Sequence, residues 1–132
     1  MRVAVSGTSG LVGTRLVAAL EGRGDEVVRL SREPEAGALA GAGAVVHLAG
    51  EPVSQRWNRE VKRRILESRE LGTRRLVEAI GSLPSDERPA SFVCASASGY
   101  YGPRGDEELP ETAAPGDDFL ARVCVAWERE AE

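Results

Sequence analysis

The chain has 132 residues, which is enough for one compact domain and too few for two. Its formal net charge of −4 argues against generic nucleic-acid binding, and no stretch is long and apolar enough to span a membrane. The two cysteines, Cys94 and Cys124, make no disulfide framework, so we expect buried thiols and a cytoplasmic protein. The only histidine, His47, has no partners for a metal site and is expected to be structural.

The first thirteen residues combine a short apolar strand, a glycine-rich turn and the start of a helix. Alternating valines predict a strand over residues 2–6, and helical spacing of apolar residues predicts a helix over 11–22. This order suits the pyrophosphate of a dinucleotide, which binds where backbone N–H groups at a helix N-terminus are free. We therefore predict that the turn binds a dinucleotide cofactor through Gly7, Thr8, Ser9, Gly10, Leu11, Val12 and Gly13.

Each glycine of this turn has its own expected role. Gly7 permits the tight turn off the strand, Gly10 lets the backbone approach the phosphates, and Gly13 lets the helix pack close to the strand. The alternative is an ordinary strand-to-helix turn that binds no ligand.

The rest of the chain alternates between strand and helix patterns, which is typical of a parallel sheet with right-handed crossovers. Strands are predicted over 26–30, 44–48 and 90–95, and helices over 57–83, with a break at Gly72, and over 117–132. Asp117 or Asp118 can cap the last helix. We therefore predict an α/β fold: a Rossmann-type doubly wound parallel sheet with three αβα layers, formed by residues 1–132 as one NAD(P)-binding domain.

The connection between the second and third strands is short for such a sheet. Only 13 residues separate Leu30 from Ala44. One short helix fits there, but a helix, a further strand and another helix do not. Either the sheet lacks its outer strand or the chain carries a deletion.

The end of the second strand is expected to select the cofactor. An acidic residue at this place binds the ribose 2′-OH of NAD, whereas an arginine accommodates the 2′-phosphate of NADP. Here Ser31 and Arg32 offer donors suited to phosphate, and Glu33 is the argument for NAD. We predict NADP as the cofactor, with NAD as the alternative. The third strand ends with Leu48, Ala49 and Gly50, and the last two are small enough to let a backbone or a ligand come close.

These motifs resemble the extended and atypical short-chain dehydrogenase/reductases, in the NAD-dependent epimerase/dehydratase group. The resemblance includes a sugar-nucleotide epimerase-like branch sometimes labelled as cell-division inhibitors. It implies NAD(P) binding on a Rossmann sheet, a nucleotide-linked sugar or similar carbonyl substrate, and a serine, Ser96, near the nicotinamide. The same resemblance implies that the turn formed by Leu48, Ala49 and Gly50 lies along the cofactor, and the alternative is an ordinary strand-end turn. It also implies that the chain corresponds to the N-terminal cofactor half of such proteins, without the substrate-binding half. The matching stretches are residues 6–13, 30–32, 45–53 with 56–57, 68–69 with 73, 96–102, and 118–120 with 127–128.

The catalytic residues that this resemblance implies are not in place. Typical relatives use a Ser or Thr and a Tyr-x-x-x-Lys pair, in which the lysine lowers the pKa of the tyrosine. Ala97 takes the Ser/Thr position, and the only lysine is Lys62, outside the last helix. The Tyr and Lys positions fall on Phe119 and Val123, or in the other register on Leu120 and Cys124. Two functions therefore remain open: an NADP-binding epimerase or oxidoreductase with an unknown small-molecule substrate, and a dinucleotide-binding module without catalysis.

The helix predicted over 57–83 carries most of its charge as arginine. Its basic residues can attract a phosphorylated ligand, but Glu60, Glu67 and Glu70 interleave with them. We therefore expect a solvated, ion-paired helix face.

Overall fold

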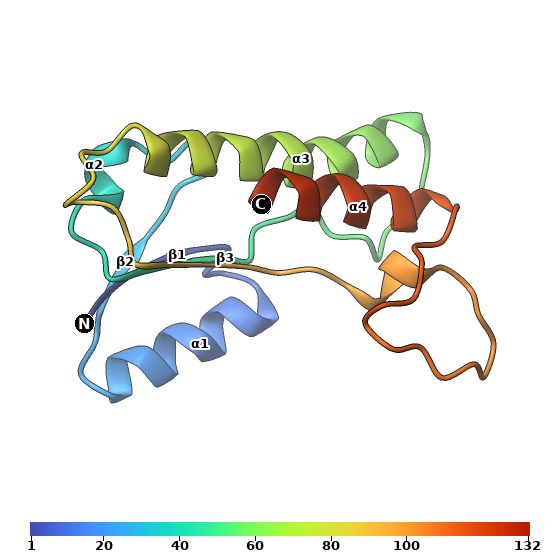
Figure 1. Cartoon of the computed structure of the whole chain (residues 1–132), viewed down its shortest axis with the longest axis horizontal. Helices are drawn as coiled ribbons and strands as arrows, with labels where there is room; N and C mark the ends of the chain where they lie inside the picture. The colour runs from blue at the N-terminus through green and yellow to red at the C-terminus, as the bar shows by residue number, and fades with distance from the viewer.

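The computed structural model describes all 132 residues, which form a parallel sheet covered by helices on both faces (Figure 1). The strands lie in the order β2-β1-β3-β4. Their bounds are β1 Arg2–Ser6, β2 Glu26–Arg29, β3 Ala44–His47 and β4 Ser91–Cys94. All pairings are parallel, so the carboxyl ends of the strands share one edge of the sheet. The predicted α/β Rossmann fold is confirmed.

The helices make the two outer layers of the predicted three. Helix α1 (Leu11–Gly22) covers one face of the sheet, and helices α2 (Ala36–Leu39), α3 (Arg59–Gly81) and α4 (Phe119–Ala131) lie over the other (Figure 1). A 3₁₀ turn, η1 (Ser98–Tyr101), follows β4. No helix combines the length and apolar composition needed to cross a bilayer.

The short connection after β2 contains a single turn of helix, α2, before the chain returns to β3 beside β1. Strand β2 therefore stands at the edge of the sheet, with no strand beyond it. The expectation that the sheet lacks its outer strand is confirmed.

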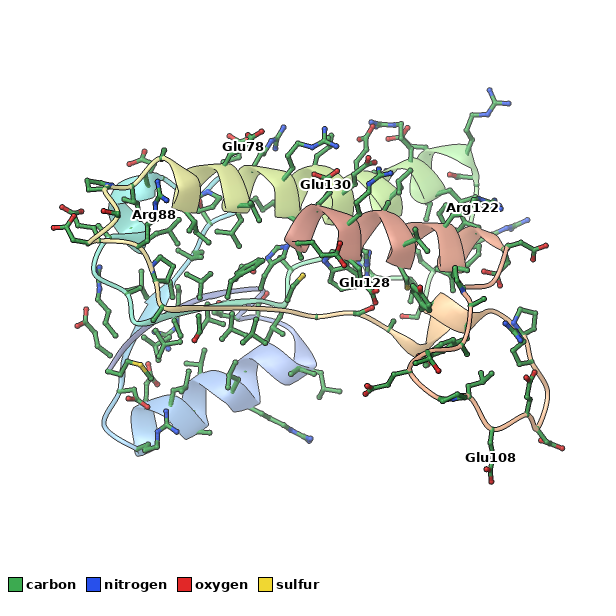
Figure 2. All side chains as sticks on the ribbon, viewed as in Figure 1. Glu78, Arg88, Glu108, Arg122, Glu128 and Glu130 are labelled. Carbon is green, nitrogen blue, oxygen red and sulfur yellow. The ribbon has the colours of Figure 1, made fainter.

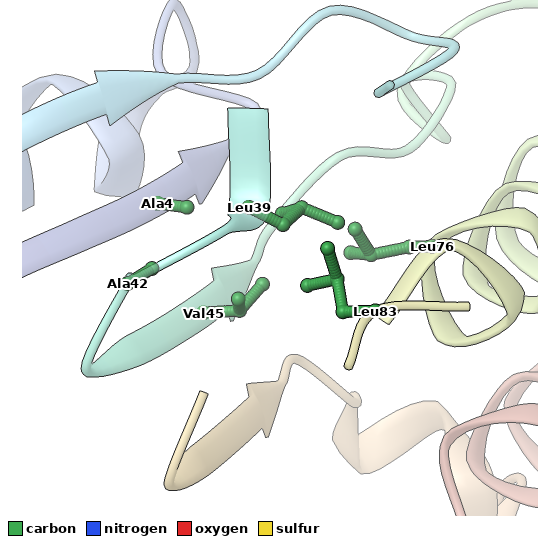
Figure 3. Close-up of a cluster of buried hydrophobic side chains, with 6 residues drawn as sticks. All are labelled: Ala4, Leu39, Ala42, Val45, Leu76 and Leu83. Carbon is green, nitrogen blue, oxygen red and sulfur yellow. The ribbon is translucent and has the colours of Figure 1, made fainter. Parts of the chain in front are cut away.

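Alternation along β1 divides the core between the two faces. Val3 and Val5 point toward α1 and pack with Leu20. Ala4 points to the opposite face and joins a cluster built from β3, α2, α3 and the loop after α3 (Figure 3). The buried members of that cluster are Ala4, Leu39, Ala42, Val45, Leu76 and Leu83. This packing fixes the C-terminal part of α3 against this face of the sheet.

The predicted break at Gly72 is wrong, because α3 runs without interruption through this position. Buried residues stand on both sides of it, at Ile65 and Leu76, and their packing outweighs the low helix propensity of one glycine. The helix begins after Asn58, whose Oδ1 accepts a hydrogen bond from the Val61 N–H at 2.8 Å. At the last helix, Asp118 rather than Asp117 provides the cap.

Candidate functional site

The turn between β1 and α1 needs glycine at two positions for steric reasons. Gly7 has φ +71°, and a Cβ there would stand 2.7 Å from the backbone nitrogen of Ala49. A Cβ on Gly13 would stand 2.1 Å from the carbonyl oxygen of Gly7. Both glycines therefore allow the β1, β3 and α1 backbones to meet.

Gly10 differs, because the chain's own fold leaves room at this position. A Cβ on Gly10 would meet only the Gly7 oxygen, at 3.4 Å. Gly10 is the N-cap of α1, and no side chain accepts a hydrogen bond from the first N–H groups of this helix. The turn thus presents unpaired backbone donors and the positive end of the helix dipole, which is an arrangement that suits an anion.

The turn residues Gly7 to Gly10, which precede these donors, line a cavity of about 790 Å³. It lies between the carboxyl ends of the first three strands and the helix α3. The cavity brings together nine of the residues predicted to hold a cofactor: Gly7, Thr8, Ser9, Gly10, Ser31, Arg32, Leu48, Ala49 and Gly50.

The other predicted residues lie elsewhere. Leu11 and Val12 are 75% and 63% exposed in the first turn of α1, and Gly13 is buried against the Gly7 backbone. Ser96 lies outside the cavity, where its hydroxyl donates a hydrogen bond to Glu128 on the side of α4 that faces the segment after β4 (Figure 2).

One wall of the cavity comes from α3, for which the sequence favoured a solvated, ion-paired face over a face that attracts a phosphorylated ligand. The residues of α3 that line it recur every three or four positions and so share one side of the helix. They are Arg64, Glu67, Ser68, Leu71, Gly72, Arg75 and Leu76. The helical spacing was available in the sequence, but which side of α3 faces the sheet follows from its packing.

Four arginines of α3 form ion pairs: two lie outside the cavity and two line it. Arg63 and Arg74 pair with carboxylates outside the cavity: Arg63 with Glu60 at 2.6 Å, and Arg74 with Glu130 at 2.7 Å. These hydrogen-bonded partners raise the pKa of both arginines. Here the predicted ion-paired face is confirmed. Arg64 and Arg75, in contrast, line the cavity.

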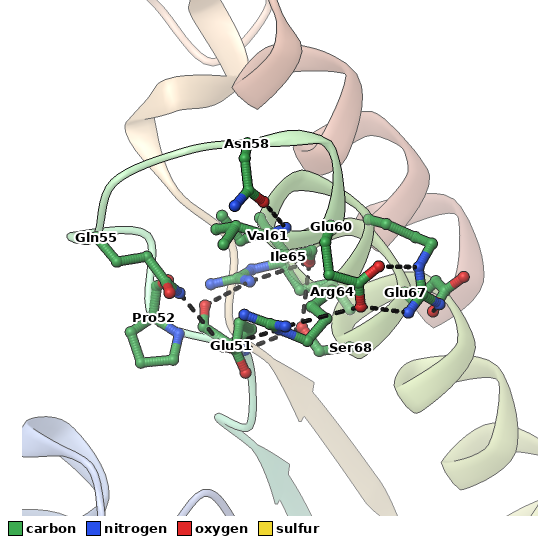
Figure 4. A network of polar contacts seen from close by, with 12 residues as sticks. Glu51, Pro52, Gln55, Asn58, Glu60, Val61, Arg64, Ile65, Glu67 and Ser68 are labelled. Atoms are coloured by element: carbon green, nitrogen blue, oxygen red, sulfur yellow. Dashed lines mark hydrogen bonds and ion pairs between the residues drawn. The ribbon is translucent and has the colours of Figure 1, made fainter.

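At one end of the cavity, the loop after β3 is tied to α3 (Figure 4). The Glu51 N–H donates to Ser68 Oγ at 2.9 Å, and Arg69 donates to the Glu51 carbonyl at 3.0 Å. The Glu51 carboxylate lies 3.6 Å from Arg64. A Cβ on Gly50 would stand 2.9 Å from the Arg69 guanidinium carbon, so a larger residue there would require this side chain to shift.

At the other end, beside β2, the charges are mostly positive. Arg32 is exposed and makes no ion pair or side-chain hydrogen bond. The Ser31 hydroxyl donates to the Glu33 carbonyl at 2.8 Å, which shapes the turn after β2. The Glu33 carboxylate does not line the cavity; it lies 3.2 Å from Arg75 and is 79% exposed.

Under the glycine turn, His47 links β1 to α3. Its Nδ1 lies 2.6 Å from Ser6 Oγ, and its Nε2 lies 3.1 Å from Thr73 Oγ1. Ser6 Oγ also accepts the Leu48 N–H, so a Ser6 hydroxyl that donates to Nδ1 leaves the ring proton on Nε2 for Thr73. Burial lowers the pKa of His47 to about 4. The histidine is thus neutral and structural, as predicted.

Residues 3–120 match the NAD dependent epimerase/dehydratase family. The chain belongs to this family.

Known members of the family share both the sequence and the fold. The epimerase family protein Mb2239 of Mycobacterium bovis is 36% identical over 96% of this chain and 46% of its own length. A structure of human epimerase family protein SDR39U1 with NADPH is 35% identical, with a TM-score of 0.84 over 100% of this chain and 49% of that one. MoeE5 in complex with UDP-glucose and NAD is 27% identical, with a TM-score of 0.81 over 99% of this chain and 48% of that one.

The chain spans about half the length of these family members. The matches include relatives bound to NADPH and relatives bound to NAD, so the family assignment covers both cofactors.

The positions that the family resemblance associates with catalysis lie at the β4–α4 end of the sheet and are apolar. Phe119 packs edge-on against Trp57, with ring centroids 5.4 Å apart. Val123 is 2% exposed and packs with Val61 and Ile65 of α3. In the other register, Cys124 is buried, and its thiol lies 3.8 Å from the carbonyl oxygen of Ala97. Both registers therefore place hydrophobic packing where a proton-transfer pair would stand.

Proposed function

We propose that this chain binds NADP(H) in the cavity between the glycine turn and α3, as the cofactor half of an epimerase- or oxidoreductase-like protein. The observation that carries the proposal is the glycine turn itself. Gly10 leaves the N-terminal donors of α1 unpaired at the edge of a cavity large enough for a ligand.

The preference for NADP over NAD is supported by the charges at the end of β2. Arg32 lines the cavity and has no protein partner. Its planar fork suits the 2′-phosphate that distinguishes NADP. The carboxylate that would favour NAD, on Glu33, is not part of the cavity lining and pairs with Arg75.

A titration of the purified chain with NADPH and NADH tests this proposal. We expect NADPH to bind more tightly, and Arg32→Ala to reduce the difference between the two cofactors. Arg59→Ala removes one charge from an exposed residue outside the cavity and should leave the difference intact. Equal dissociation constants for the wild-type chain would contradict the NADP preference, and failure to bind either cofactor would contradict the function.

The second candidate function is dinucleotide binding without catalysis, favoured by the apolar residues at positions 119 and 123. The two functions are separated by incubating the chain with NADP and a panel of sugar nucleotides, following the absorbance of NADPH for net oxidation and analysing the sugar nucleotides for epimerisation, which regenerates NADP. Cofactor binding without any turnover supports the module, and NADPH formation or epimerisation supports the enzyme.

A further inference from the structure

The charges around the mouth of the cavity are unevenly balanced. The acidic residues of the cavity wall are already paired: Glu67 lies 2.6 Å from Arg63, and Glu51 lies 3.6 Å from Arg64. Arg32 has no counter-charge at all. The only counter-charge of Arg75 is Glu33, at 3.2 Å. The β2 end of the cavity therefore has two arginines and one carboxylate.

The Arg75–Glu33 contact joins two segments that lie far apart in the sequence. Arg75 belongs to the α3 wall of the cavity, and Glu33 belongs to the turn after β2, one residue after Arg32. Both side chains are largely exposed, at 54% and 79%. An ion pair with this exposure contributes little to stability, because water screens it. Replacing the Glu33 carboxylate by a stronger anion at Arg75 therefore costs little free energy.

We propose that Arg75 is a second arginine of a 2′-phosphate site, and that Glu33 occupies it as an internal anion until the phosphate arrives. The inference rests on the proposed binding of NADP(H) in this cavity. A phosphate monoester carries up to two negative charges and three acceptor oxygens, so it is a better partner for a guanidinium than one exposed carboxylate. When Arg75 turns from Glu33 to the phosphate, Arg32 and Arg75 hold it from β2 and from α3.

This arrangement gives α3 a part in cofactor choice. NAD has only a hydroxyl at the same place and cannot replace the carboxylate, so Arg75 stays with Glu33. Arg75 is thus a specificity-determining residue, and Glu33 weakens the binding of NADP by competing for it. Removing Glu33 should strengthen NADP binding only while Arg75 is present.

The test is a cycle of four proteins: wild type, Arg75→Ala, Glu33→Gln and the double variant. The dissociation constants of NADPH and NADH are measured for each by fluorescence titration. We expect Arg75→Ala to weaken NADPH about tenfold and NADH by less than about twofold. Glu33→Gln should strengthen NADPH about threefold in the wild-type background and have no effect in the Arg75→Ala background. Arg59→Ala serves as the control for loss of one positive charge.

The possible outcomes separate this inference from the proposed function. If Arg75→Ala weakens NADPH and NADH equally or not at all, Arg75 does not contact the phosphate, although dinucleotide binding stands. If Glu33→Gln has the same effect on NADPH affinity with and without Arg75, the phosphate does not replace Glu33 at Arg75. If the wild-type chain binds neither cofactor, the proposed function and this inference both fail. The same measurement with adenosine 2′,5′-bisphosphate and AMP repeats the comparison without the nicotinamide half. The ratios of the dissociation constants between the four proteins should be the same.

Discussion

The β1–α1 and β4–α4 junctions lie at the same carboxyl edge of the sheet but are built differently. At the first junction, Gly7 and Gly13 bring backbones into contact, and the free donors of α1 face a cavity. At the second, Val123 and Phe119 pack against α3 and the loop before it. Like β2, β4 is an edge strand, and its Val93 is 54% exposed. The chain thus has unpaired helix donors beside a cavity at one end and hydrophobic packing in place of reacting groups at the other.

This difference means that family membership supports a cofactor more strongly than a reaction. The features that a dinucleotide needs are formed by this chain's own residues. The positions that the family resemblance associates with proton transfer are part of a small hydrophobic cluster that joins α4 to α3. We therefore expect substitutions at the β4–α4 junction to change the free energy of unfolding, whereas substitutions at the β1–α1 junction can also change cofactor affinity.

The largest expected effect is at the β4–α4 end. Val123→Lys, which introduces the lysine of the usual catalytic pair, places an ammonium group beside Val61 and Ile65 without a partner. We expect a loss of about 4 kcal/mol of unfolding free energy, measured by urea denaturation. Val125→Lys on the same helix is the matched control, because Val125 is 37% exposed and should tolerate the change. A stable Val123→Lys protein would mean that this end can accept a catalytic lysine.

At the β1–α1 end, Gly13→Ala should cost about 3 kcal/mol, because its Cβ would overlap the Gly7 backbone. Urea denaturation of the variant measures this loss. Gly10→Ala is the matched variant in the same turn. Its Cβ has only one contact, at 3.4 Å, so we expect an intact fold. Cofactor affinity should nevertheless fall at least about tenfold, because the methyl group stands where the phosphates approach the backbone. Unchanged NADPH binding by Gly10→Ala would contradict the assigned position of the pyrophosphate.

Much of the first junction could be predicted from the sequence because its signals are local. The spacing of Gly7, Gly10 and Gly13 encodes the turn, and alternating valines encode the strand. The α3 wall could not be predicted in the same way. Arg75 meets Glu33 only because Leu76 packs α3 onto the sheet, and the two residues are 42 positions apart. Gly72 was predicted to break α3 because local propensity was weighed without this packing.

His47 joins β1 to α3 through Ser6 and Thr73, and its protonation should weaken the fold. Burial lowers its pKa to about 4, below the usual value of 6.5, so the unfolded state binds more protons between these two values. Stability should therefore fall as pH falls through this window, by about 2 kcal/mol between pH 7 and pH 5. Urea denaturation at several pH values measures this slope.

His47→Gln is the control, because it removes the titrating group. Between pH 7 and pH 5, the free energy of unfolding of His47→Gln should fall by about 2 kcal/mol less than that of the wild type. Identical slopes in the two proteins would show that His47 does not carry the acid sensitivity.

The smallest expected effect on stability is at Gly72, and its sign is positive. A Cβ there would meet no atom within 4 Å, and the residue lies inside α3, so Gly72→Ala should stabilise the chain by up to about 1 kcal/mol. Gly72 also lines the cavity, whereas Gly81 in the same helix has equal space and does not. We therefore expect Gly72→Ala to raise stability and to lower the affinity for NADPH. Gly81→Ala should leave NADPH binding unchanged.

Thermal unfolding and cofactor titration of both variants measure this difference. If Gly72→Ala is more stable but binds NADPH more weakly, the approach of the ligand explains why this position is glycine. If Gly72→Ala binds NADPH as tightly as the wild type, the cofactor does not pack against this side of α3. The anion site at the glycine turn would then be the only formed part of the cofactor end, and α3 would belong with β4 and α4 to the part of the molecule that provides packing alone.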